Sequence, residues 1–184
     1  MQLPYYQGPV AFNEGALLDS GAVDAVAHAL QLVHELVGDL DLPRLAAAYR
    51  HIGARHENFR TGFVRTETSW QRQVFSHLAF GLQVVELRDA PDPEATARAH
   101  ITELFRHPFN RAVPPLLRVV LFRLTDTRHW VVNHCDHLVM DGVTFATALP
   151  AARFKRGGRS FGVSSCATGA GPIIDEVRCP SPDA

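Results

Sequence analysis

Two apolar runs in the middle of the chain decide the fold: LLRVVLFRL at 116–124 and HWVVNHC at 129–135. Between them lie four polar residues, TDTR at 125–128. Two such runs around a short polar turn predict a β-hairpin, and their nearly continuous apolar character predicts burial on both faces. The hairpin is therefore expected in the middle of a sheet, where any polar side chain is costly unless it has a partner.

Two helices are expected, and both precede these runs in the sequence. Asp41 is a good N-cap with a proline close behind it, and the apolar spacing that follows runs to Arg55. Asp92, directly before another proline, begins the second helix, which should end at His107 because a proline follows that residue.

Further strands are expected from short apolar or β-branched segments. They lie at 26–37, 63–67, 70–78 and 83–87. Strands and helices that mix without strict alternation predict an α/β or α+β fold, a two-layer sandwich with a mixed sheet. Residues 1–149 should form this unit, and the Gly-, Ser- and Pro-rich stretch 150–184 is expected to be a flexible or degenerate tail.

Composition excludes several classes of function. The chain has 184 residues, 18 Lys and Arg against 19 Asp and Glu, and a formal net charge of -1. No strong field exists to hold nucleic acid, and no apolar run is long enough for a membrane-spanning helix. A cytoplasmic protein without nucleic-acid or membrane partners is therefore expected. Three cysteines are too few for a disulfide framework or a four-thiolate zinc site.

Polar groups with catalytic potential gather at 133–142, NHCDHLVMDG, where the second apolar run ends. His137 is the candidate general base, because an imidazole titrates near neutrality and can accept a proton from an attacking hydroxyl or amine. Asp141, followed by Gly142, is better suited to hold the loop through an ion pair or to cap a helix that begins at Val143.

Three other interpretations of this segment stay open on residue types alone. A strand end can simply carry polar residues, with Asp-Gly as an ordinary turn. A metal site from His134, Asp136 and His137 is disfavoured because two histidines three apart on a strand point to opposite faces. Cys135 as a nucleophile is weaker still, because it lies among apolar residues and buried thiols are usually inert. Five other histidines are expected at the surface or at element ends: His51, His77, His100, His107 and His129.

Four sequence blocks resemble the condensation domains of nonribosomal peptide synthetases, within the chloramphenicol acetyltransferase-like superfamily. DHLVMDG at 136–142 is similar to the motif His-His-x-x-x-Asp-Gly, and RHENFRTGF at 55–63 to Arg-His-Glu-x-Leu-Arg-Thr-x-Phe. PFN at 108–110 and PLLR at 115–118 match the pattern that leads into the strand pair before the motif. The blocks stand in the family's order, within a resemblance that covers about 36–149.

The resemblance assigns roles to single residues. It implies that His137 is the catalytic second histidine of the motif, Asp141 its structural aspartate and Gly142 the flexible loop residue. Asp136 stands where the family has the first histidine, a mainly structural position. We therefore expect the activity to be weakened or retuned and not necessarily lost. The arginine that pairs with the structural aspartate is expected to be Arg60, with Arg55 as the alternative.

The resemblance also implies an activity and its partners. Condensation-like enzymes transfer an acyl group from a phosphopantetheine thioester to an amine or hydroxyl, and so form an amide or ester. The thioester belongs to an acyl or peptidyl carrier protein or to coenzyme A, so no cofactor, prosthetic group or metal is expected on this chain.

Condensation domains have two lobes, and this sequence matches the N-terminal lobe only. Homo-oligomerisation, as in the trimeric chloramphenicol acetyltransferase, or a second lobe from another chain is expected to complete the site. The alternative is a truncated, inactive condensation-domain remnant or a carrier-protein binding module.

Overall fold

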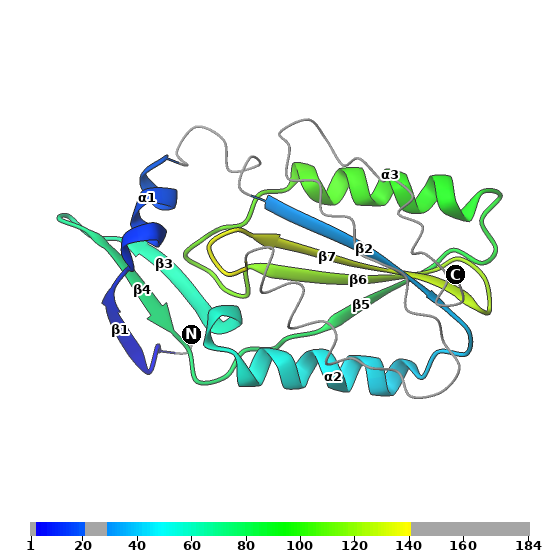
Figure 1. Cartoon of the computed structure of the whole chain (residues 1–184), viewed down its shortest axis with the longest axis horizontal. Coiled ribbons are helices and arrows are strands. Elements are labelled where there is room, and N and C mark those ends of the chain that lie inside the picture. The colour runs from blue at the N-terminus through cyan, green and yellow to red at the C-terminus, as the bar shows by residue number, and fades with distance from the viewer. Residues whose placement is uncertain (1–2, 21–28, 141–184) are drawn as a thin grey trace, which may run out of the picture.

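The computed structural model describes residues 3–20 and 29–140, and it places the expected hairpin at the centre of a four-stranded sheet (Figure 1). The strands lie in the order β2-β7-β6-β5. Their bounds are β2 Ala29–Val37, β5 Leu82–Glu86, β6 Leu117–Arg123 and β7 Arg128–Asp136. β5 is parallel to β6, while β6 and β2 each pair antiparallel with β7, so the predicted mixed sheet is confirmed.

Both expected helices are present with their predicted caps. They are α2, Leu42–Arg55, and α3, Pro93–Arg106. The Asp41 carboxylate accepts from the Arg44 amide at 2.9 Å, and the Asp92 carboxylate accepts from the Ala95 amide at 2.9 Å. In each helix the aspartate thus satisfies one of the free N–H groups of the first turn, and a proline occupies a position that needs no amide proton.

One helix covers each face of the sheet, and Figure 1 shows the four strands between α3 and α2. Alternate residues of β7 divide between two apolar cores: Val131 lies in the core that includes Tyr49 of α2, and Val132 in the core that includes Ile101 of α3. The α/β class is confirmed. A two-layer sandwich was expected, and the structure has three layers: α2, the sheet and α3. The physical reason is that β6 and β7 are apolar on both faces and each face needs a cover.

A second, three-stranded sheet with the order β1-β4-β3 lies beside the larger one (Figure 1). Its strands are β1 Tyr6–Pro9, β3 Thr61–Arg65 and β4 Trp70–Val74. Two helices belong to the same part of the chain: α1 Phe12–Ser20 and the short 3-10 helix η1 Glu57–Arg60. The sequence did not predict β1 or α1. Neither has a clear apolar face, and Leu18 is the single buried residue of α1.

One of the histidines predicted at the surface or at an element end lies at an element end and is buried there. His129, predicted at the surface or an element end, is the second residue of β7 and is fully buried. The structure describes nothing beyond residue 140, so the predicted tail at 150–184 lies outside the described residues. Within the described ranges, no helix is long and apolar enough to cross a membrane.

Candidate active site

A short turn at the end of β7 carries the predicted catalytic histidine. Asp136 is the last residue of the strand, and the exposed side chain of His137 begins the turn. The Asp136 carbonyl accepts from the Val139 amide at 3.1 Å, and its Oδ1 accepts from the Leu138 amide at 3.0 Å. Asp136 therefore holds the turn from both its backbone and its side chain, a local arrangement that aspartate favours.

The carboxylate of Asp136 is buried and paired. Its side chain is 3% exposed, and Oδ2 accepts from Arg111 Nε at 2.8 Å. Arg111 is itself 14% exposed, so both charges lie largely out of water. A carboxylate buried to this degree needs a cation and hydrogen-bond donors, and Asp136 has both.

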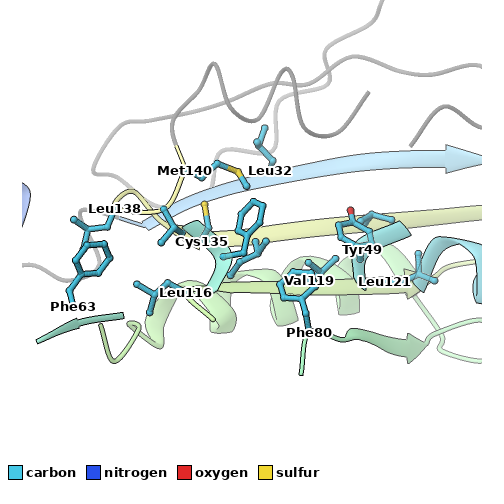
Figure 2. Close-up of a cluster of buried hydrophobic side chains, with 14 of the residues drawn as sticks. Leu32, Tyr49, Phe63, Phe80, Leu116, Val119, Leu121, Cys135, Leu138 and Met140 are labelled. Carbon is cyan, nitrogen blue, oxygen red and sulfur yellow. The ribbon is translucent and has the colours of Figure 1, made fainter. Parts of the chain in front are cut away.

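Backbone hydrogen bonds bring the separate sequence blocks together at this turn. The Asp136 amide donates to the Leu116 carbonyl at 3.0 Å, and the Phe63 amide donates to the Arg111 carbonyl at 2.7 Å. Phe63, Leu116 and Leu138 also belong to one apolar cluster, drawn in Figure 2. Segments that lie far apart in the sequence therefore meet beside His137, and the turn packs against the apolar cluster that they form.

His134 and His137 are separated, as their spacing predicts. The ring of His134 is fully buried, stacked on Phe109 with centroids 5.0 Å apart and 5.8 Å from the ring of Phe105. Burial lowers the pKa of His134 to about 4, and the nearby Arg118 guanidinium acts in the same direction. His134 is thus a neutral core residue at pH 7. Within the described part of the chain, no group of three His, Cys, Asp or Glu residues is placed to hold a metal ion.

Cys135 lies on the opposite face of β7 from Asp136 and is fully buried in the core that α2 covers. Burial is the main cause that raises the pKa of its thiol, and the neighbouring negative charge of Asp136 adds to it. A thiol that is buried and protonated is a poor nucleophile. The geometry gives Cys135 a packing role.

The two arginines predicted to pair with Asp141 lie in and beside η1. Arg60 is half-buried, and its Nη1 donates to the carbonyls of Phe75 and, at 3.2 Å, Ser76. Arg55 is exposed in the last turn of α2. Asp141 and Gly142 lie outside the described residues, so the pairing with either arginine stays a prediction.

Sequence reasoning missed Arg111. The argument that a buried carboxylate needs a guanidinium was applied to Asp141 and not to Asp136, although Asp136 ends an apolar strand. The available signal was the position of Arg111, directly after the PFN block at 108–110, in the segment that leads into the partner strand β6. A cation at that point is close to the end of β7 because β6 and β7 form a hairpin.

The fold and the histidine-bearing turn define an α/β domain of the condensation-domain type. The family model described as "Condensation domain" matches residues 23–149. The chain belongs to the condensation domain family.

Among curated relatives, the chain is 31% identical over 123 residues to surfactin synthase subunit 1 of Bacillus subtilis (strain 168), a match that covers 66% of this chain and 3% of that protein. It is 33% identical over 126 residues to tyrocidine synthase 3 of Brevibacillus parabrevis, a match that covers 68% of this chain and 2% of that protein. The chain thus spans only a small part of the relatives that it matches.

Solved structures share the fold. The starter condensation domain of the rhizomide synthetase matches with a TM-score of 0.70 and 17% identity, over 78% of this chain and 37% of that one. The first condensation domain of the calcium-dependent antibiotic synthetase, solved with a substrate analogue, matches with a TM-score of 0.72 and 20% identity, over 79% and 37%. The chain accounts for somewhat more than a third of each of these structures.

Proposed function

We propose that this chain supplies the histidine-bearing lobe of a condensation-type acyltransferase, which forms an amide or ester from a phosphopantetheine thioester. One observation carries the proposal. His137 occupies the position of the catalytic histidine in the motif, and its side chain is exposed while the residues on either side of it, Asp136 and Leu138, are buried. An exposed imidazole on a turn held by hydrogen bonds is suited to act on a bound substrate.

In the proposed reaction, an amine or hydroxyl attacks the thioester carbonyl. A new C–N or C–O bond forms, the C–S bond breaks, and the proton of the nucleophile passes through His137 to the departing thiolate. The thioester is already activated, so holding the two reactants in register contributes most, on the order of 7 to 11 kcal/mol in well-oriented systems. His137 would orient the nucleophile and take its proton.

The proposed substrates arrive on partners. The donor thioester would belong to the phosphopantetheine arm of a carrier protein or to coenzyme A, so the chain itself would need no resident cofactor. The matched synthetases are much longer than this chain, and the matched domain structures are nearly three times its aligned part. We therefore propose that a second lobe completes the site.

Substitution of His137 tests the proposal. The full chain is incubated with acyl-pantetheine donors and aminoacyl-pantetheine acceptors, and the condensed product is measured by mass spectrometry beside the oligomer mass from light scattering. His137→Ala should lower the rate by about 100-fold to 10,000-fold, as expected for loss of a general base. His51→Ala removes an exposed histidine of α2 and should leave the rate unchanged.

The outcomes separate the proposal from its alternative. A monomer that shows no product with any donor and acceptor pair would identify a remnant or a carrier-binding module. Equal rates for the His137 variant and wild type would reject the assigned role of His137 even if product forms.

A further inference from the structure

Asp136 stands where the family motif has its first histidine, and its contacts show what the exchange supplies. One carboxylate oxygen accepts from Arg111 Nε at 2.8 Å, and the other accepts from the Leu138 amide at 3.0 Å. An imidazole has one acceptor at most and no negative charge. It could not bind a guanidinium and a backbone amide at the same time in this way.

Arg111 is fixed at both its backbone and its side chain. Its carbonyl accepts from the Phe63 amide at 2.7 Å, which ties the residue to β3. Its side chain is largely buried, and Asp136 is its carboxylate partner. Within the described residues Nη2 has no hydrogen-bond partner, so the contact with Asp136 is the main one that holds the guanidinium.

A continuous chain of contacts therefore runs from β3 to the turn that carries His137. It passes from the Phe63 amide to Arg111, from the guanidinium to Asp136, and from the carboxylate to the Leu138 amide, the residue after His137. Each step is a hydrogen bond of 2.7 to 3.0 Å, and the central step joins two opposite charges that are mostly out of water. Such bonds fix geometry better than exposed ones do.

We propose that Arg111 is a positioning residue for His137 and acts through Asp136. The guanidinium fixes the carboxylate, the carboxylate fixes the turn, and the turn sets where the imidazole meets the substrate. Arg111 itself touches no reacting atom. The inference rests on the proposed function, because it takes His137 as the reacting side chain.

Three variants of the full chain test the inference: Arg111→Met, Asp136→Asn and the double variant. The amide introduced by Asp136→Asn would keep an oxygen for the Leu138 amide and lose the charge that holds Arg111. Amide hydrogen exchange at Leu138 and Val139 should become about tenfold faster or more in each variant. The kcat should fall by about tenfold to 100-fold, with KM changed much less, because misplacement of a reacting group acts on the chemical step.

Three further comparisons separate positioning from a general loss of stability. The double variant should lose no more activity than the single ones, because the two residues act as a unit, and Arg111→Lys should recover part of the kcat. Arg128→Met breaks an ion pair at the opposite end of β7 and should leave both exchange and kcat at the wild-type values.

The readouts distinguish failure of this inference from failure of the proposed function. Unchanged exchange at Leu138 and Val139 in Arg111→Met would overturn the inference, and so would an equal effect of Arg128→Met. If the wild type forms no product, the proposed function fails, and the exchange rates still decide whether Arg111 holds the turn. If Arg111→Met does not fold, Arg111→Lys and Asp136→Asn carry the same measurements.

Discussion

Each end of β7 contributes one residue to an arginine–carboxylate contact, and the two contacts lie in different surroundings. At the start of the strand, Arg128 contacts Glu35 at 2.6 Å and Glu94 at 2.8 Å, and the three side chains are 33% to 42% exposed. At the end, Arg111 and Asp136 lie 2.8 Å apart and are 14% and 3% exposed. The distances are alike, so burial decides what each contact is worth.

Water explains the difference. An exposed ion pair gains little, because water already solvates both charges and salt screens them. A buried pair is costly to form, yet removal of one partner leaves the other charge without water or counter-ion. The end of β7 therefore tolerates change poorly, and that end carries the candidate active site.

The largest effect is expected from Asp136→Ala. This variant leaves Arg111 unpaired and removes the acceptor of the Leu138 amide. It should lower the free energy of unfolding by about 3 to 5 kcal/mol, the range seen when one partner of a buried pair is removed. Urea denaturation followed by circular dichroism measures this value.

Glu35→Ala is the matched control, since it removes a carboxylate from the partly exposed pair at the start of the same strand. If the two variants lose the same stability, burial does not set the difference between the two ends.

The second largest effect concerns pH. His134 lies two residues before Asp136, and its pKa is lowered to about 4 by burial. The ring binds a proton near pH 6.5 in the unfolded chain and only near pH 4 in the native state. The contribution of the neutral ring to the free energy of unfolding is therefore complete above pH 6.5 and decreases as the pH falls towards 4. The loss should reach about 3 kcal/mol, from 1.36 kcal/mol for each pKa unit.

His134→Leu removes the titrating ring and keeps an apolar side chain of similar size between Phe105 and Phe109. The free energy of unfolding of this variant should rise relative to that of wild type as pH is lowered from 6.5 to 4. A constant difference between the two proteins over this range would show that His134 does not titrate with a lowered pKa.

The sequence predicted the periodic and capped elements well and the buried polar contacts poorly. Asp41 and Asp92 identify the starts of α2 and α3 because capping is local chemistry. The position of His137 at the end of β7 also followed from sequence, since the strand pattern and the motif agree.

The remaining features depend on contacts between distant residues. The pairing of Arg111 with Asp136 joins residues 25 apart, and its one signal was the hairpin that brings the segment before β6 to the end of β7. The presence of β1 likewise follows from tertiary packing, because its segment carries no distinct periodicity of its own. Chemical reasoning found that the end of β7 needs satisfied polar groups, and only the fold showed which residue satisfies them.

A smaller effect is expected where β3 meets the segment before β6. Gly62 lies so close to this segment that an added Cβ would come within 2.9 Å of Pro114 Cδ and 3.0 Å of the Ala112 carbonyl oxygen. Gly62→Ala should therefore cost about 1 to 3 kcal/mol, because the two segments must move apart. Thermal unfolding measures the loss.

Gly81→Ala provides the control, because no atom of the described residues beyond its own chain neighbours lies within 4 Å of the Cβ that it would add. That variant should be neutral or slightly more stable than wild type, by about 0.4 to 1 kcal/mol. Gly62 neighbours Phe63, whose amide binds the Arg111 carbonyl, so Gly62→Ala should also speed amide exchange at Leu138. If exchange at Leu138 is unchanged, the close packing of β3 at Gly62 does not help to hold the turn.

The smallest effect is expected at the partly exposed start of β7, from Glu35→Gln. The change keeps the size of the side chain and removes the charge that Arg128 contacts, while Glu94 remains as the second partner of that guanidinium at 2.8 Å. The loss of stability should be about 0 to 1 kcal/mol. It should shrink as salt is raised from about 0.1 M to about 1 M, because the Debye length falls from about 10 Å to about 3 Å.

Asp136→Asn, measured under the same salt conditions, should keep its full loss of stability because the buried pair is shielded from ions. If salt abolishes both losses equally, the pair at the end of β7 behaves as an exposed one and the contrast between the two ends disappears.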